Sequence, residues 1–150
     1  MSILLSGKIL ALFISKVGIS QRAPETKVFL DKNGIINDKF HDKDVTRSVL
    51  ITSSQSYDLA KEYGINMPYG SLGENLLIDY NPYKLASGSK LHIGDVILQI
   101  SQNCTICNHL SSIDERLPKL LQHDRGIFAQ VIQGGIIKKD DKIYLEEKLS

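Results

Sequence analysis

The sequence predicts a mainly β (β-rich α+β) fold, a compact β-barrel with a few short peripheral helices. Three observations support this prediction. Apolar runs of strand length recur along the chain, turn residues separate them, and only one segment, residues 53–63, has an undisturbed helical pattern. A length of 150 residues corresponds most simply to a single domain over residues 1–150, with a core from about residue 8 to residue 145.

The predicted strands are rich in Ile, Leu and Val and are bounded by glycine, proline or asparagine. They are Lys8–Ser15, Lys27–Leu30, Ser48–Ile51, Glu74–Asp79, Lys90–Ile93, Val96–Ser101, Ile127–Gln133 and Ile136–Leu145. Gly94-Asp95 and Gly134-Gly135 are two-residue turns, so each is expected to join its flanking strands into a hairpin.

Two segments carry helix signals. Thr52-Ser53-Ser54-Gln55 fits a capping box with Thr52 as N-cap, which predicts a helix over residues 53–63 that ends at Gly64. A second capping box begins at Ser112, and Pro118 disturbs the helical pattern after it, so two short helices are expected there.

Composition limits the possible partners. A net charge of +1 gives no general attraction to nucleic acid or to an acidic membrane, so any basic site must be local. The apolar stretch Ile3–Ile14 contains Lys8, follows no charged region and is too short to span a bilayer, so we expect a buried strand of a soluble cytoplasmic protein.

Three short motifs follow one another in the middle of the chain, between residues 73 and 107. They are Gly73-Glu74-Asn75-Leu76, Ile93-Gly94-Asp95, and Ser101-Gln102 followed five residues later by Cys107. This set resembles the MOSC domain family, the C-terminal domains of molybdenum cofactor sulfurases and their stand-alone relatives. The resemblance runs from about Lys8 to Leu145 and also implies a compact β-rich barrel.

A fourth segment matches the family in part. MOSC domains carry Gly-Asp-Arg/Lys-x-His ahead of a basic residue and a strand, and this chain has Asn37 in place of the glycine, then Asp38, Lys39 and His41. Arg47 precedes the strand predicted from Ser48. A solvated loop is the alternative interpretation of these polar residues.

The resemblance implies that Cys107 is a catalytic residue and a metal ligand, since the matching cysteine of cofactor-binding relatives gives a thiolate to molybdenum. The implied activity is reductive removal of oxygen from N-hydroxylated small molecules, with electrons from a separate protein. The alternatives are a sulfur-carrier or cofactor-handling module with a persulfide on Cys107, or a binding domain without an active centre. No pyridoxal phosphate site is expected.

Six further residues are candidate ligands of molybdenum cofactor. Arg47 and Arg125 suit a phosphate because a guanidinium group can bind it bidentately, and both precede strands whose ends converge in a barrel. Glu74 and Asn75 offer acceptors and a donor to a pterin edge or a substrate, or else they hold a turn and pair with an arginine. Lys39 and His41 complete the set.

Two features of the cysteine segment stay open. Family members often carry Pro-Arg ahead of the cysteine, whereas this chain has Asn103-Cys104-Thr105-Ile106 and so lacks a basic residue there. Cys104 could be a resolving thiol for Cys107. Zinc bound by both cysteines, His109 and His123 is another possibility, but the spacing is unlike that of structural zinc sites, so no stoichiometric zinc is expected.

The spacing from Ser101-Gln102 to Cys107 leads to the first prediction. Cys107→Ser should abolish molybdenum retention or persulfide formation and leave the fold intact, while Cys104→Ser should have a milder effect. Metal analysis and native mass spectrometry of both variants test this. An essential Cys104 beside a dispensable Cys107 would show that the signature has been aligned on the wrong thiol.

Overall fold

Seven strands close into a barrel in the computed structural model, which describes residues 2–105 and 109–147. The order around the barrel is β11-β7-β8-β9-β5-β6-β1, and pairing of β1 with β11 closes it. The strands are β1 (Ile3–Ile14), β5 (Val49–Ser53), β6 (Leu76–Ile78), β7 (Lys90–Ile93), β8 (Val96–Asn103), β9 (Ile127–Gln133) and β11 (Lys142–Glu146). The predicted mainly β barrel is therefore confirmed.

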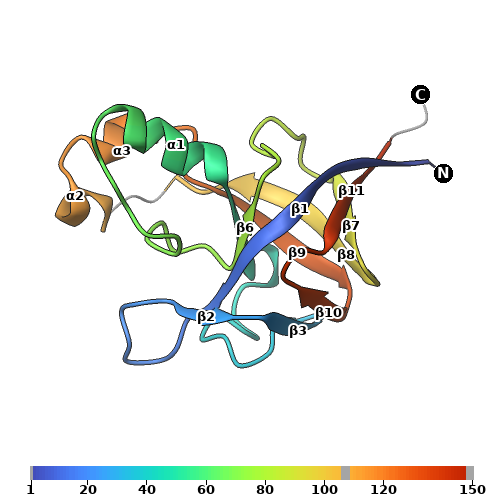
Figure 1. The fold of residues 1–150 in the computed structure, drawn as a ribbon. Helices are drawn as coiled ribbons and strands as arrows, with labels where there is room; N and C mark the ends of the chain where they lie inside the picture. Colours follow the sequence, from blue (N-terminus) through green and yellow to red (C-terminus); the bar gives the residue numbers. More distant parts are fainter. Residues whose placement is uncertain (1, 106–108, 148–150) are drawn as a thin grey trace.

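The remaining elements lie around this barrel. The strand β2 (Ala23–Glu25) pairs with the end of β1, and β10 (Gly135–Lys138), β3 (Lys27–Asp31) and β4 (Gly34–Ile35) form a separate small sheet. The helices are η1 (Val45–Arg47), a 3-10 turn, and α1 (Ser54–Glu62), α2 (Leu110–Ile113) and α3 (Leu117–Leu120). Figure 1 shows α1, α2 and α3 together on one side of the barrel and both termini on the opposite side.

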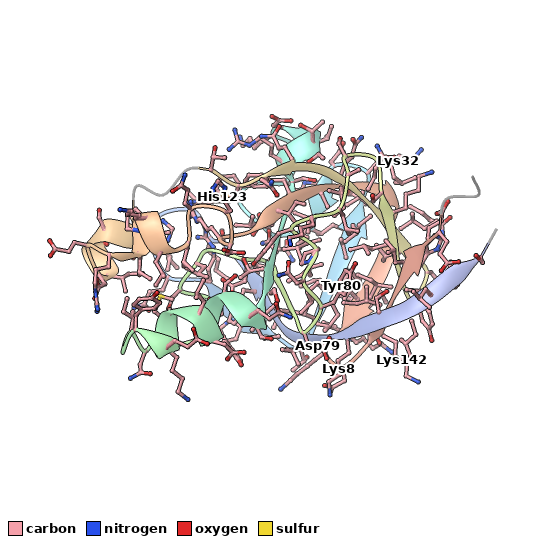
Figure 2. All side chains as sticks on the ribbon, turned by 90° about the horizontal axis from the view of Figure 1, so that it is seen from above. Lys8, Lys32, Asp79, Tyr80, His123 and Lys142 are labelled. Atoms are coloured by element: carbon pink, nitrogen blue, oxygen red, sulfur yellow. The ribbon has the colours of Figure 1, made fainter. Side chains whose placement is uncertain are left out.

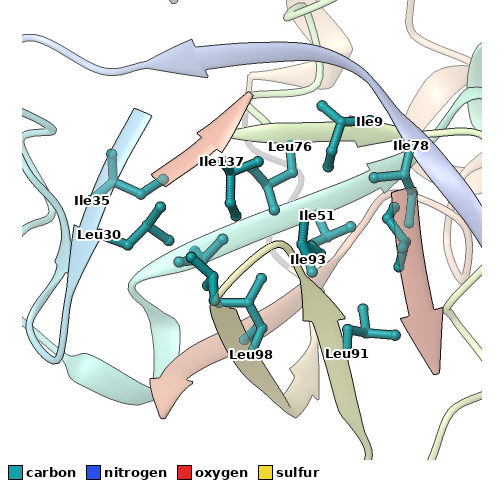
Figure 3. Packing of buried hydrophobic residues seen from close by; sticks show 14 of the residues in the cluster. Ile9, Leu30, Ile35, Ile51, Leu76, Ile78, Leu91, Ile93, Leu98 and Ile137 are labelled. Atoms are coloured by element: carbon teal, nitrogen blue, oxygen red, sulfur yellow. The ribbon is translucent and has the colours of Figure 1, made fainter. Parts of the chain in front are cut away.

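Two apolar clusters hold these elements. Ile and Leu side chains from the strands fill the barrel (Figure 3), and a second cluster lies between the barrel and the helices. The strand β6 contributes to both clusters because its side chains alternate: Leu76 and Ile78 face the barrel interior, and Leu77 faces the helices. Burying each such side chain contributes about 1.5–3 kcal/mol.

The unit β5–α1–β6 provides the only parallel strand pair among the described strands. Its helix begins one residue later than predicted, because Ser53 and not Thr52 is the N-cap, accepting from the N–H of Gln55. Thr52 stays in the buried strand, where its hydroxyl donates to the carbonyl of Arg125 (2.8 Å). Gly64 ends the helix as predicted, with φ +76°.

The first strand is longer than predicted, and its N-terminal half pairs with β11. At Gly7 a side chain has no room, since a Cβ there would lie 2.5 Å from Asp79 Oδ1. The N–H of Lys8 donates to the same carboxylate (2.8 Å), and Figure 2 shows Lys8, Asp79 and Lys142 gathered on one side of the barrel. The loop after β6 therefore holds the middle of β1.

Three sequence predictions for the C-terminal half were wrong in detail. Gly134-Gly135 does not join a hairpin: β9 pairs with β8 and β5, whereas β10 pairs with β3. The strand predicted over 136–145 is also broken, by a turn at 139–141. Two short helices occur around Pro118 as expected, but Ser112 lies inside α2 and caps no helix.

Gly134 allows the chain between β9 and β10 to pass close to the backbone of β3. A Cβ at this position would lie 2.4 Å from the backbone oxygen of Leu30 in β3. Gly134→Ala should therefore reduce the free energy of unfolding by about 3 kcal/mol, because the backbone of β3 must move. Gly88→Ala is the matched control: Gly88 has φ +94° and open space around it, so only backbone strain of about 1 kcal/mol is expected. Urea denaturation measures both, and equal losses would contradict the close approach.

Candidate functional site: a cationic cavity at the barrel rim

Asn75 lies just before β6 and joins three segments through its side chain. Its Oδ1 accepts from the N–H of Leu50 (3.0 Å), and its Nδ2 donates to the carbonyl of Phe13 and to Asp38 Oδ1 (3.2 Å each). Asn75 is 4% exposed, so these bonds are sheltered from water. Both amide hydrogens are used, which makes Asn75 primarily a structural residue of the rim.

Asp38 is the centre of the loop that follows the small sheet. It is buried, and its carboxylate accepts from the N–H groups of Ser15 (2.6 Å) and Phe40 (3.1 Å) as well as from Asn75. The preceding residue, Asn37, has φ +74°. Asparagine tolerates this left-handed conformation better than most residues, so Asn37 can replace the glycine seen elsewhere in the family pattern.

Glu74 is buried beside this site and lines neither of the cavities described below. Its Oε2 accepts from the hydroxyl of Tyr57 (2.6 Å) and the N–H of Gly70 (3.0 Å), while Oε1 has no hydrogen-bond partner among the described residues. Burial raises the pKa of Glu74, and the donors on Oε2 together with the charge of Arg22 counteract that rise only in part. Glu74 therefore supports the loop over residues 70–73.

Arg125 follows the helices and is 7% exposed. Its Nη2 donates to His109 Nδ1 (3.3 Å) and lies 3.5 Å from the carbonyl of Leu72, while Nε has no partner among the described residues. His109 Nε2 lies 3.2 Å from the carbonyl of Ser71, so a neutral ring protonated at Nε2 satisfies both contacts. Burial, and then the charge of Arg125, lower the pKa of His109.

Arg22 is a functional candidate that sequence analysis did not select. Its Nε donates to the carbonyl of Gly73 (3.2 Å), and it is half-buried. Burial lowers the pKa of Arg22, as does the charge of Arg125, whereas Asp38 and Glu74 act in the opposite direction. The loop between β1 and β2 contains no sequence motif typical of a binding site, so Arg22 is identified as a candidate only from its position in the fold.

Arg22 and Arg125 approach each other at Gly73. A Cβ on Gly73, which has φ +83°, would lie 3.2 Å from Arg22 Nη2 and 3.9 Å from Arg125 Nη2. Glycine is favoured here by the positive φ, and a Cβ would also crowd the end of the Arg22 side chain. Because Gly73 has no side chain, the guanidinium groups of Arg22 and Arg125 both face the small space beside its Cα.

A cavity of about 360 Å³, here called cavity A, opens on this volume. Four of its lining residues are cationic: Arg22, Lys43, Arg47 and Arg125. The rest of its wall consists of Phe40, Asp44, Ser48, Leu50, Gly73, Asn75, Cys104 and Phe128. The chain has four arginines, and three of them line this cavity.

A second cavity, here called cavity B, has a volume of about 580 Å³ and shares Arg22 and Gly73 with cavity A. The rest of its wall consists of Ser20, Gln21, Pro68, Tyr69, Gly70, Ser71, His109 and Ile113. The two cavities therefore meet at the Arg22–Gly73 contact.

The structure brings only some of the predicted site residues together. Arg47, Asn75 and Arg125 line cavity A, and Arg47 lies over the ring of Phe128 at 4.8 Å. Lys39 lines neither cavity A nor cavity B, and its ammonium group lies over the ring of Phe40 (5.0 Å).

His41 also lies outside both cavity walls and contacts Asp31, with Nε2 2.8 Å from Oδ1. Cys107 lies outside the described residues. Of the residues around it, Cys104 lines cavity A and His109 lines cavity B. Within the described ranges no group of three or more His, Cys, Asp or Glu side chains is arranged to hold a metal ion.

The protein is therefore a β-barrel with a cationic cavity at its rim. The chain belongs to the MOSC domain family, because the family's sequence model matches residues 37–144. No curated protein sequence matches the chain. Among the helices of the described residues, none is long and apolar enough to cross a membrane.

Solved structures share the fold. The YuaD protein from Bacillus subtilis superposes with a TM-score of 0.80 at 16% identity, over 97% of this chain and 98% of that one. YiiM from Geobacillus stearothermophilus gives a TM-score of 0.75 at 20% identity, over 94% of this chain and 75% of that one. YiiM from Escherichia coli gives 0.69 at 18% identity, over 95% and 71%.

The buried Glu74 generates a prediction about pH. Because its pKa is raised above the ordinary value of 4.5, the folded state binds this proton more tightly than the unfolded chain. The free energy of unfolding should therefore fall as the pH rises above about 4.5, where the unfolded chain has already lost the proton. Glu74→Gln keeps an acceptor for Tyr57 and Gly70 and removes this titration.

Glu74→Gln should thus gain stability relative to the wild type as the pH rises. Denaturant titrations at a series of pH values measure the difference, with Glu62→Gln, at an exposed helix position, as the control. A difference that does not change with pH would show that Glu74 titrates alike in the folded and unfolded states.

Proposed function

We propose that cavity A binds molybdenum cofactor and that the protein is a small oxidoreductase acting on N-hydroxylated molecules. The observation that carries this proposal is Arg125, a buried guanidinium whose Nε has no partner among the described residues and which lines a cavity with three further cations. An unpaired buried charge is costly, and an anion in the cavity would supply the missing acceptor.

The charge balance of cavity A supports an anionic ligand. Four cationic side chains face one carboxylate, Asp44, which is partly engaged because its Oδ1 accepts from the N–H and hydroxyl of Thr46 (3.1 and 2.7 Å). Glu74 and Asp38 lie outside the lining, and Glu74 Oε2 and both oxygens of Asp38 accept from protein donors. The phosphate group of the cofactor would therefore meet an excess of positive charge.

Different segments would hold different parts of the ligand. Arg22 and Arg125 meet at Gly73, where the missing side chain leaves room for a phosphate to accept from both guanidinium groups. Arg47 is stacked on Phe128, another residue of the lining, so its fork is pre-oriented and loses less freedom on binding. Phe40 and Leu50 add apolar wall for the pterin ring.

Molybdenum, when bound with Cys107 as a protein ligand, supplies two-electron chemistry that can remove oxygen from an N-hydroxylated substrate. This chain's residues bind the anion, exclude water with Phe40, Leu50 and Phe128, and keep His109 neutral beside Arg125. Electrons would come from a separate donor protein.

Metal and sulfur analysis of protein made in a cofactor-producing host tests the proposal. We expect about one molybdenum and one released pterin per chain in the wild type, and neither in Cys107→Ser. Labile sulfur on Cys107 without molybdenum would contradict cofactor binding and favour a sulfur carrier. Tightly held zinc would contradict an available Cys107 thiolate.

Cofactor binding should also depend on Arg47 and Arg125. A charge-assisted hydrogen bond contributes about 1.5–3 kcal/mol, so each Ala variant should bind the pterin cofactor roughly 10- to 100-fold more weakly. Lysine should restore binding only in part, because it lacks the guanidinium fork. Equilibrium titration of both single variants and the double variant, at two salt concentrations, measures the effect.

Arg116→Ala is the matched control. Arg116 is an exposed arginine that pairs with Asp114 (2.9 Å) and lines neither cavity. It should bind cofactor as the wild type does. Unchanged affinity in both Arg47→Ala and Arg125→Ala would remove the anion site from cavity A.

A further inference from the structure

The N-terminal part of β1 forms a two-stranded ribbon with β11 and has a second edge that is open. β11 pairs with β1 over residues 3–8, whereas β6 pairs with the other edge of β1 only from Ile9 onward. Figure 1 shows this part of β1 extending beyond the other strands of the barrel. Among the described strands, none pairs with the second edge of β1 before Ile9.

The main-chain groups on this edge belong to two residues. The N–H of Glu147 donates to the carbonyl of Ser2 (3.0 Å), so the main chain of Ser2 faces β11. Because main-chain groups alternate in direction along a strand, those of Leu4 also face β11, and those of Ile3 and Leu5 face away from it. The register with β11 shifts just after Leu5, so the regular part of the edge ends there.

The side chains of this edge are apolar and exposed. Ile3, Leu4 and Leu5 are 48%, 53% and 54% exposed. Edge strands of soluble proteins usually carry a charge or a proline that prevents association, but residues 2–7 contain neither. The first charged residue is Lys8, whose N–H already donates to Asp79 (2.8 Å). The edge therefore lacks the features that protect most edge strands from pairing.

We propose that two copies of this protein pair through the open edge, β1 against β1 in antiparallel orientation, about a two-fold axis at Leu4. In this register Ile3 of each copy lies opposite Leu5 of the other, and their outward N–H and C=O groups exchange hydrogen bonds. The two Leu4 residues meet at the axis as a pair without hydrogen bonds. A shift of two residues toward the barrel would instead place Ile3 opposite Gly7, beyond the irregularity in β1.

The same register aligns apolar side chains across four strands. Leu4 lies opposite Leu145 of β11, which packs against the barrel core. Pairing at the axis would therefore join Leu145 and Leu4 of one copy to Leu4 and Leu145 of the other in one row. On the opposite face, Leu5 lies beside Tyr144 and would gain Ile3 of the second copy as its other neighbour. Directly opposed apolar side chains of this kind stabilise paired strands.

A second copy fits this edge because the edge is complementary to itself. With no charge over residues 2–7, it offers nothing that would select a charged peptide or nucleic acid. Residues 143–145 of β11 are paired on both sides, with β1 and with β7, so the described part of the ribbon has one open edge. Pairing two copies uses both of their open edges, and the assembly closes as a dimer and does not grow into a filament.

This dimer leaves the cationic cavity open. The pairing edge is at the start of β1, whereas Phe13, which bonds to Asn75 at the rim of cavity A, is near the other end of the strand. The dimer is therefore independent of the function proposed for cavity A. The interface is small, and interfaces of this size class are typically weak, so we expect a dissociation constant in the micromolar range.

Sedimentation equilibrium over a range of concentrations should show the wild type passing from monomer to dimer. Leu5→Lys should weaken the dimer at least about tenfold, because it places two unpaired charges in apolar rows. Val17→Lys is the matched control, since Val17 is an 85% exposed apolar residue in the loop between β1 and β2, and it should dimerise as the wild type does. Urea denaturation verifies that each variant folds.

A proline tests the main-chain pairing separately from the loss of apolar surface. Ile3→Pro removes an N–H that faces away from β11, which a proline on an edge strand tolerates. Ile3→Ala removes most of the side chain but keeps this N–H. Because two symmetry-related hydrogen bonds depend on it, Ile3→Pro should weaken the dimer at least about tenfold more than Ile3→Ala does.

Cross-linking tests the register, in a Cys107→Ser background in which the remaining native thiol is the buried Cys104. Residues that face each other in a pair without hydrogen bonds have Cα atoms about 4.5 Å apart, close enough for a disulfide. Leu4→Cys should therefore form an interchain disulfide on mild oxidation. Ser2→Cys should not, because the two copies of Ser2 would be offset by four residues, about 13 Å along the strand.

A protein that stays monomeric at every concentration overturns the proposal, and this is also the result expected if the edge binds only a strand of a different protein. A dimer that withstands both Leu5→Lys and Ile3→Pro overturns it as well, because the interface would lie elsewhere. Equal cross-linking of Leu4→Cys and Ser2→Cys contradicts the two-fold axis at Leu4. None of these measurements depends on molybdenum content.

Discussion

The hydrogen bonds of the Asn75 side chain are the constraint on which the rim of the barrel depends. One amide joins Leu50 of β5, Phe13 of β1 and the carboxylate of Asp38. Its backbone continues the same links, since its N–H donates to Leu50 and its carbonyl accepts from Phe13. Because a buried amide left without partners costs about 1–3 kcal/mol, the three segments cannot separate independently. The residues that line cavity A are carried on these segments or directly beside them.

This rigid rim explains how like charges can be held close together. Arg22 and Arg125 converge on Gly73, and the charge of Arg125 helps to lower the pKa of Arg22. Asp38 and Glu74 offset the repulsion from behind the wall, where their carboxylates are engaged by protein donors. The positive charge is thus directed into the cavity, while the compensating negative charge is not available to a ligand. If an anion binds here as proposed, holding the guanidinium groups in place beforehand would reduce the cost of ordering them on binding.

Sequence patterns predicted those elements of the structure that depend on interactions between residues close together in the chain. The barrel class, the hairpin at Gly94-Asp95, the helix after β5 and its end at Gly64 all follow from periodicity, turn residues and capping. Gly134 was misinterpreted because a glycine needed for close approach to Leu30 looks in the sequence like a turn glycine. The capping-box pattern predicts Thr52 as the N-cap, and this is wrong because the Thr52 hydroxyl donates instead to the carbonyl of Arg125, 73 residues away, a contact that no local pattern reveals. Arg22 was missed for the same reason: its partners, Gly73, Glu74 and Arg125, are distant in sequence.

The segment just before Cys107 lacks a basic residue, but other segments of the fold supply cations to cavity A. The segment Asn103-Cys104-Thr105-Ile106 contains no cationic residue, and the buried Cys104 lines cavity A. Arg22 from the loop after β1 and Lys43 from the loop before η1 line the same cavity. Since an anion responds to the sum of nearby charges and to donor geometry, the segment that supplies each cation is not important. The partial match of residues 37–41 is similar, because Asn37 adopts the left-handed conformation that a glycine would adopt. In both cases a departure from the family pattern in the sequence is compatible with a cationic cavity in this chain.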